Sequence, residues 1–140
     1  MSTILIVEDK ESLRTMLRTT LEGRGFRVDE AGDVYDARRR IQASRYMAVL
    51  TDLRLPAGSG FEVLQAAREA DPETPVIVMT AFGTIEEAVR AMKEGATDFL
   101  TKPVELPALL VVVERALENQ RNRRHHLARR TRDARRAIDP

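Results

Sequence analysis

The 140-residue chain contains no cysteine, which excludes disulfide bonds and thiolate metal sites and agrees with a reducing compartment. No apolar run approaches the ~18 residues that a membrane-spanning helix needs. The first residues, Met-Ser-Thr followed directly by Ile-Leu-Ile-Val, lack the charged start and the small-residue cleavage site of a signal peptide. Together these absences predict a cytoplasmic protein with no membrane partner.

Three motifs of nucleotide and phosphate enzymes are also missing. A nicotinamide dehydrogenase would carry GxGxxG after its first strand, where this chain has EDKESLR at 8–14. A haloacid-type phosphatase would show DxDx[TV], whereas Asp52 is followed by Leu-Arg-Leu. No GxxxxGK[ST] loop of an ATPase domain occurs. The sequence therefore argues against these three classes.

Charge is divided unevenly along the chain. Residues 1–118 hold 15 Lys and Arg against 20 Asp and Glu, whereas residues 119–140 hold eight Arg and two Asp, which gives net charges of −5 and +6. We therefore predict one globular domain over residues 1–118, a length that suits a single core. Residues 119–140 are expected to form a basic helical extension or linker, and a coiled coil and a solvated tail are both open readings.

Short β-rich runs alternate with longer amphipathic ones through residues 1–118. The pattern predicts strands at 4–7, 26–31, 48–50, 76–79 and 98–101. It predicts helices at 12–22, 34–43, 61–70, 85–93 and 106–117. The first, third and fourth strands are apolar throughout, as strands of a parallel sheet covered on both faces should be.

Start and stop signals support these helices. Asp33 can cap the second helix, residues 84–87 have the capping-box form, and Gly23 and Gly95 follow the first and fourth helices. Five strand–helix units in a row predict an α/β fold with a doubly wound five-stranded parallel sheet and five helices. In such folds the active crevice lies at the carboxyl ends of the strands.

Polar side chains follow four of the five predicted strands. They are Glu8 and Asp9 after the first, Asp52 after the third, Thr80 after the fourth, and Lys102 with Pro103 after the fifth. Each alone has an ordinary explanation as a helix cap, a β-forming threonine or a solvated lysine. Their joint placement on one edge of one sheet favours a functional site.

The composition of this cluster restricts its chemistry. Three neighbouring carboxylates repel one another unless a cation intervenes, and oxygen ligands without cysteine or clustered histidine favour Mg²⁺. With Mg²⁺ and Lys102 neutralising the phosphoryl oxygens and Thr80 hydrogen-bonding one of them, Asp52 could attack a phosphoryl group. The expected product is an aspartyl phosphate.

Four motifs resemble the receiver domain of two-component response regulators, which has a flavodoxin-like fold: IVED at 6–9, TDLRLP at 51–56, MTA at 79–81 and DFLTKP at 98–103. The resemblance covers about residues 3–118. The stretch MTAFGTIEEAVRAMKEGATDFLTKP is most similar to the NtrC-like subgroup, whose receivers commonly precede an ATPase domain and a DNA-binding helix-turn-helix. Neither domain is visible in the sequence, so the chain is expected to be either an excerpt or a stand-alone receiver.

The resemblance implies a role for each residue at the strand ends. Asp52 would be the phosphoacceptor, and Lys102 would hold the phosphoryl group. Asp9, Asp52 and the main-chain carbonyl of Arg54 would bind Mg²⁺, and Glu8 would reach the ion largely through water. Thr80 and Phe99 would be the two residues that change position on phosphorylation, the switch pair. The Lys102–Pro103 bond would be cis. Such a protein is a phosphoacceptor rather than an enzyme, with at most self-catalysed phosphorylation and dephosphorylation.

One loop departs from the family pattern. Residues 57–60 read Ala-Gly-Ser-Gly where relatives often have Gly-Met-Asp-Gly, and Gly60 remains available there for a position with positive φ. Arg54 and Phe82 occupy positions that in the family tune how fast water reaches the phosphoryl group.

The resemblance also implies partners and an output. The phosphoryl donor would be a sensor histidine kinase, and the fourth helix, fifth strand and fifth helix would form the face that signals. A homodimer through this face or through an extended last helix is possible, and transcription would be controlled through a downstream domain, so that DNA is contacted only indirectly. A stand-alone receiver acting by protein contact is the alternative. Nucleic-acid binding by the basic segment is a minor one, because no aromatic residues are interleaved with its arginines and the folded part is acidic.

Overall fold

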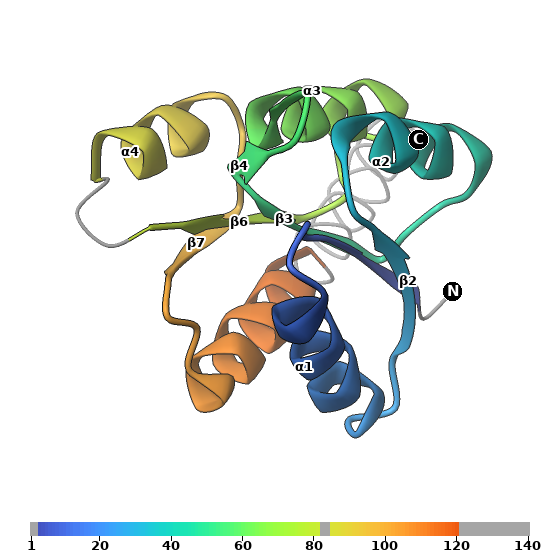
Figure 1. The fold of residues 1–140 in the computed structure, drawn as a ribbon, viewed down its shortest axis with the longest axis vertical. Helices are drawn as coiled ribbons and strands as arrows, with labels where there is room; N and C mark the ends of the chain where they lie inside the picture. Colours follow the sequence, from blue (N-terminus) through green and yellow to red (C-terminus); the bar gives the residue numbers. More distant parts are fainter. Residues whose placement is uncertain (1–2, 82–84, 121–140) are drawn as a thin grey trace, which may run out of the picture.

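A computed structural model describes residues 3–81 and 85–120 of the chain. Five strands form one parallel sheet in the order β2-β1-β3-β6-β7 (Figure 1). These strands are β1 (Thr3–Val7), β2 (Arg27–Ala31), β3 (Ala48–Asp52), β6 (Val76–Thr80) and β7 (Asp98–Thr101). The helices are α1 (Glu11–Glu22), α2 (Val34–Ala43), α3 (Gly60–Ala70), α4 (Ile85–Lys93) and a fifth over residues 106–120. The predicted five-stranded doubly wound α/β fold is confirmed.

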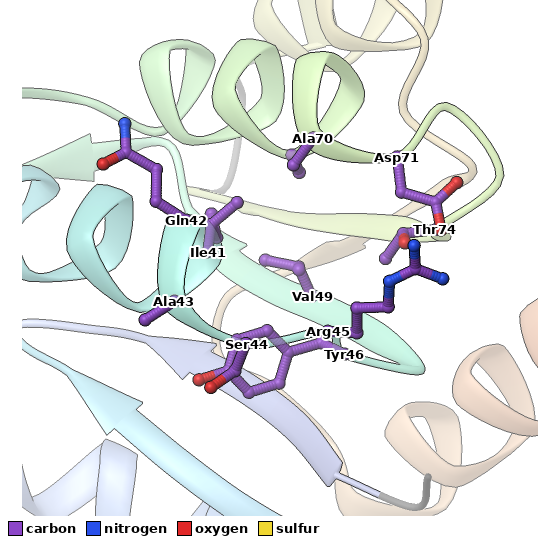
Figure 2. Close-up of a pocket in the computed structure, with 11 residues that line it drawn as sticks. Ile41, Gln42, Ala43, Ser44, Arg45, Tyr46, Val49, Ala70, Asp71 and Thr74 are labelled. Atoms are coloured by element: carbon purple, nitrogen blue, oxygen red, sulfur yellow. The ribbon is translucent and has the colours of Figure 1, made fainter.

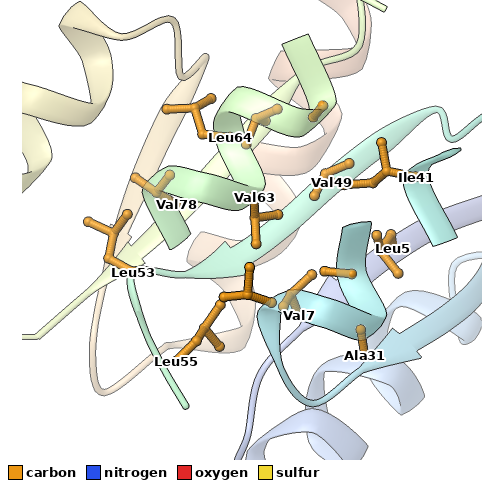
Figure 3. Packing of buried hydrophobic residues seen from close by; sticks show 14 of the residues in the cluster. Leu5, Val7, Ala31, Ile41, Val49, Leu53, Leu55, Val63, Leu64 and Val78 are labelled. Atoms are coloured by element: carbon orange, nitrogen blue, oxygen red, sulfur yellow. The ribbon is translucent and has the colours of Figure 1, made fainter. Parts of the chain in front are cut away.

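The sheet lies between two layers of helices. Figure 1 shows α2, α3 and α4 on one face, and α1 with the fifth helix, drawn in orange, on the other. Successive residues of β1 point to opposite faces, so Leu5 and Val7 belong to one apolar cluster and Ile4 and Ile6 to the other, all fully buried. Figure 3 shows the first cluster, in which Val63 and Leu64 of α3 face the sheet.

Two strands extend further than their apolar runs. The pattern predicted strands at 48–50 and 76–79, yet β3 includes Asp52 and β6 includes Thr80. Asp52 is paired with Met79, and Thr80 with Thr101. Main-chain pairing does not depend on side-chain polarity, so the sheet continues under the polar residues and gives them the rigidity of a strand.

A second, two-stranded antiparallel ribbon was not predicted. It consists of β4 (Arg54–Leu55) and β5 (Gly58–Ser59), joined by a turn in which Ala57 has φ 60°. The positive φ in this loop falls on Ala57 and not on Gly60, the position that was available for it. Gly60 is needed for close approach instead, since a Cβ there would lie 2.1 Å from the carbonyl oxygen of Asp52.

The helix ends agree with most of the signals in the sequence. Asp33 caps α2, because its Oδ1 accepts a hydrogen bond of 2.7 Å from the Asp36 main-chain N–H. Gly95 follows α4 with φ 110°, whereas Gly23 stays right-handed at φ −63° and Gly25 takes the positive φ. The proposed capping box begins at Thr84, which lies outside the described residues.

The fifth helix buries Leu109, Val112, Val113 and Ala116 against the sheet. Leu106, Leu110, Val113 and Leu117 follow one another at a 4-3-4 spacing along this helix, and three of them are half-buried at the edge of the same cluster. The helix continues to Gln120, whose Nε2 donates to the Glu73 carbonyl at 2.8 Å. The rest of the predicted basic extension or linker, residues 121–140, lies outside the described residues.

Helix α4 is the least anchored of the labelled helices. Its buried residues are Ala88 and Ala91, whereas Ile85, Val89 and Met92 are exposed. A buried methyl group contributes only ~0.8 kcal/mol, compared with ~1.5–3 kcal/mol for a fully buried large aliphatic side chain. The free energy that holds α4 on the sheet is correspondingly small.

Within the described part of the chain, no helix has the length and apolarity to cross a membrane.

Substitution of Gly60 tests the close approach at the end of β3. We expect Gly60→Ala to destabilise the fold by about 3 kcal/mol, the upper end of the usual cost of overpacking, because the clash is with main-chain atoms. Gly23→Ala is the matched control, since its Cβ would meet atoms no closer than 3.4 Å and its φ is right-handed. Urea denaturation measures both, and equal stabilities would contradict the assigned role of Gly60.

Candidate functional site

Four strands bring the predicted residues to one edge of the sheet. Glu8 and Asp9 follow β1, Asp52 ends β3, Thr80 ends β6 and Lys102 follows β7. We call these five residues the strand-end site. Lys102 is fixed beside β6, because its main-chain N–H donates to the Thr80 carbonyl at 2.7 Å. The Lys102–Pro103 peptide bond is cis, the isomer that the family resemblance implies.

The Asp52 carboxylate is held from two sides. Lys102 Nζ lies 2.5 Å from Oδ2, and the Arg54 main-chain N–H donates to Oδ1 at 3.0 Å. The Asp52 carbonyl accepts from the buried Thr51 hydroxyl at 2.9 Å, on the strand end that Gly60 approaches. Asp52 is only 6% exposed, so its orientation is set by these contacts rather than by solvent.

Glu8 is fully buried and shares the same ammonium group. Its Oε1 lies 2.7 Å from Lys102 Nζ, its Oε2 accepts from the Lys10 main-chain N–H at 3.0 Å, and Arg14 Nη1 donates to its carbonyl at 2.8 Å. Burial raises the pKa of Glu8, although the hydrogen bond from Lys102 opposes the shift. Burial alone would lower the pKa of Lys102, but its hydrogen bonds to Asp52 and Glu8 outweigh this and raise it.

The carboxylates can also hold a metal ion. Glu8, Asp9 and Asp52 each offer an oxygen, and these oxygens all lie within 4.8 Å of one another. Asp9 is exposed, so the group opens to solvent on one side. An all-oxygen set of this charge fits a hard divalent cation such as Mg²⁺. The carbonyl of Arg54 as a further ligand stays a prediction.

The two proposed switch residues line one groove. Thr80 is 2% exposed at the end of β6, whereas Phe99 of β7 is 42% exposed. Both face a groove of ≈380 Å³ beside α4, which we call the α4 groove; its other lining residues are Ala81, Ile85, Ala88, Val89, Met92, Lys93 and Thr101. Phe82, the second position expected to tune water access, lies outside the described residues.

Sequence reasoning missed two charged residues around the site. Arg14 of α1 binds the Glu8 carbonyl, and Glu87 of α4 forms an ion pair with Arg54, with 3.3 Å between Oε1 and Nη2. Arg14 follows Glu8 by six residues, and Glu87 follows Arg54 by 33. Helical periodicity could place Arg14 beside β1, but no local signal pairs Glu87 with Arg54.

A cavity of ≈520 Å³ lies elsewhere, where α2 and α3 end (Figure 2). Its walls include Ile41, Tyr46, Val49 and Asp71. None of the residues of the strand-end site lines it. Cavity size therefore does not locate the chemistry in this fold.

The raised pKa of Glu8 makes stability depend on pH. The folded protein binds this proton more tightly than the unfolded chain does, so the contribution of Glu8 is favourable below its unfolded pKa and is lost as pH rises through the folded pKa. We expect Glu8→Gln, measured without divalent cations, to be more stable than the wild type at pH 7 and to lose this advantage as pH falls toward 4.5, the ordinary value.

Urea denaturation between pH 4 and 8 measures this difference, with Glu11→Gln as the control for removal of a carboxylate at the surface. A Glu8→Gln advantage that does not change with pH would contradict the assignment.

Comparisons with known proteins agree with this geometry. The family model "Response regulator receiver domain" matches residues 4–114. Response regulator protein PilR of Pseudomonas aeruginosa is 41% identical over 113 residues, which are 81% of this chain and 25% of PilR. The photosynthetic apparatus regulatory protein RegA of Rhodobacter capsulatus is 39% identical over 102 residues, 73% of this chain and 55% of RegA. The chain spans about a quarter of the length of PilR and of several other curated relatives that it matches.

Solved structures give the same result. The receiver domain of NtrX from Brucella abortus superposes with a TM-score of 0.78 at 33% identity, covering 82% of this chain and 98% of that one. The beryllofluoride-activated NtrC4 receiver domain dimer superposes with a TM-score of 0.80 at 32% identity, covering 86% and 99%. This chain therefore belongs to the response regulator receiver domain family, with relatives among the NtrC-like regulators.

Proposed function

We propose that this chain is a phosphorylation-dependent switch in which Asp52 accepts a phosphoryl group with the help of Mg²⁺. The observation that carries the proposal is the Lys102 ammonium group, which lies within 2.7 Å of both Asp52 and Glu8 at the open edge of the sheet. A cation in this position is close enough to neutralise the oxygens of a phosphoryl group bound to Asp52. Membership of the receiver family supports the same role.

The reaction is a transfer between two nucleophiles. An oxygen of the Asp52 carboxylate forms a bond to phosphorus, while the phosphorus–nitrogen bond of a phosphohistidine donor breaks. The imidazole nitrogen leaves with the electron pair of that bond, and the imidazole ends as the neutral ring or its protonated form. Mg²⁺, when bound, supplies positive charge to the transferring oxygens, and Asp9 with Asp52 and Glu8 would hold it.

The three carboxylates are suited to different tasks. Asp52 sits at the end of β3 with its oxygens oriented by Lys102 and the Arg54 main-chain N–H, as a nucleophile must be. Glu8 is fully buried and Asp9 is exposed, which suits an indirect and a direct role in binding the cation. The chain would then be a phosphoacceptor with at most self-catalysed chemistry.

The output would pass through α4. Thr80 ends β6 and lines the α4 groove, and movement of its hydroxyl toward the phosphoryl group would leave room in this groove for the exposed Phe99 ring. Because α4 is anchored by two alanines, it can change position at small cost. The surface formed by α4, β7 and residues 106–120 would carry the signal.

The partners follow from this role. A cytoplasmic sensor histidine kinase would donate the phosphoryl group, and a homodimer through the α4–β7 side or the last helix would transmit it. Transcription would be controlled through a further domain, a reading that the name "Transcriptional regulatory protein" of the relative ZraR from Salmonella typhimurium supports. A receiver acting by protein contact alone is the second candidate.

The chemical proposal is tested with a small phosphodonor and Mg²⁺. The wild-type chain should gain the mass of one phosphoryl group, and Asp52→Asn should gain none, because the nucleophilic oxygen is replaced by an amide. Intact-mass spectrometry measures both. Labelling of Asp52→Asn at the wild-type level would exclude Asp52 as the acceptor.

Asp9→Ala serves as the metal control. Loss of a supporting group costs ~10–100-fold in metal affinity, so loss of a direct ligand should weaken Mg²⁺ binding by at least that factor. Titration calorimetry that finds wild-type affinity would remove Asp9 from the metal site, and phosphorylation that proceeds equally in a chelator would remove the metal from the reaction.

The output proposal is tested on Thr80. Thr80→Ala should still be labelled at Asp52, yet the phosphorylated variant should transmit a smaller change to α4 than the wild type does, because the hydroxyl that would link Asp52 to the α4 groove is absent. Hydrogen exchange of Ile85–Lys93 with and without phosphodonor measures the response, which should be several-fold in the wild type. An equal response in Thr80→Ala would show that the signal takes another route.

A further inference from the structure

An ion pair connects β4, which lies next to the strand-end site, to α4. The guanidinium group of Arg54 in β4 lies 3.3 Å from the Glu87 carboxylate, with Arg54 68% and Glu87 35% exposed. The main chain of Arg54 lies beside the proposed acceptor, because its N–H donates to Asp52 Oδ1. The same residue therefore contacts the acceptor carboxylate through its main chain and α4 through its side chain.

Within the described residues, Arg54 is the ion-pair partner of Glu87, and the neighbouring charged residues of α4 do not take its place. Arg90, one turn further along α4, is engaged elsewhere: it pairs with Glu94 at 2.6 Å and lies 3.9 Å over the Phe61 ring. Glu86 points into solvent and has no ion pair within residues 3–81 and 85–120. The α4 helix thus reaches β4 by one charged contact.

This contact is a substantial part of what holds α4. The helix buries only Ala88 and Ala91, and its larger apolar side chains are exposed. An exposed ion pair is weak in absolute terms, but it is comparable to the burial of one methyl group. Loss of the ion pair therefore removes a larger fraction of the free energy that holds α4 on the sheet than it would for a helix packed through leucines.

A phosphoryl group on Asp52 would compete for the same guanidinium. It carries more negative charge than a carboxylate, and its oxygens match the planar fork of arginine. We infer that Glu87 is a positioning residue: it holds the Arg54 side chain on α4 in the unphosphorylated protein and yields it to the phosphoryl group. Phosphorylation would thereby release α4 at Glu87, independently of Thr80 and Phe99. The inference rests on the proposed function of Asp52.

Beryllofluoride with Mg²⁺ serves as the probe, because it mimics a phosphoryl group without turnover. In Glu87→Gln the Arg54 side chain no longer has to leave a partner, so the full chain should bind the probe about 1.5- to 5-fold more tightly, the range expected for an exposed ion pair. Glu86→Gln is the matched control, since it removes the same charge from the neighbouring position and should leave affinity unchanged. High salt should reduce the difference in probe affinity between Glu87→Gln and the wild type, because it screens the exposed ion pair.

Arg54→Gln completes the test as a double-mutant cycle. If the inference holds, Glu87→Gln has no effect in the Arg54→Gln background, because the competing partner is already absent. Hydrogen exchange of Ile85–Lys93 without probe should also be faster in Glu87→Gln than in Glu86→Gln. Equal affinities of Glu87→Gln and Glu86→Gln, or an unchanged Glu87→Gln effect without Arg54, would overturn the role of Glu87. A wild-type chain that does not bind the probe would instead overturn the proposed function of Asp52.

Discussion

One ammonium group makes the rest of the site possible. Lys102 lies between Asp52 and Glu8, two carboxylates with almost no access to solvent. Without a cation between them, these two carboxylates would repel one another when both are charged. The ammonium group opposes this repulsion, although burial still raises the pKa of Glu8. It also means that any phosphoryl group on Asp52 would meet a positive charge already in position.

This arrangement depends on the parallel sheet. Apolar runs bury β1, β3 and β6 on both faces, and their carboxyl ends then meet at the same edge. The sheet supplies rigidity, and the loops after it supply the polar groups. Burial of Glu8 destabilises the folded protein, and the burial of apolar side chains in the two core clusters offsets this loss. Function in this molecule therefore uses part of the stability that the core provides.

The sequence allowed the fold and much of the site to be predicted, for physical reasons that can be named. Periodicity locates strands and helices because burial selects apolar residues at fixed spacing, and the parallel topology then brings Glu8, Asp52 and Lys102 together. The same logic stops where main-chain geometry decides, as in the extension of β3 to Asp52 and the positive φ at Ala57. It also fails for the pair of Arg54 and Glu87, because contacts between exposed side chains far apart in the chain leave no periodic signal.

The close approach at Gly60 gives the site two unequal walls. On the α3 side, the start of the helix lies directly against the Asp52 carbonyl, with no room for a single additional carbon atom. On the α4 side, the described contacts are lighter: two small buried side chains, the ion pair of Glu87 with Arg54, and Arg90 over the Phe61 ring. A force generated at Asp52 therefore meets a stiff boundary in one direction and a compliant one in the other. A displacement that starts at Asp52 is therefore directed toward α4 rather than toward α3.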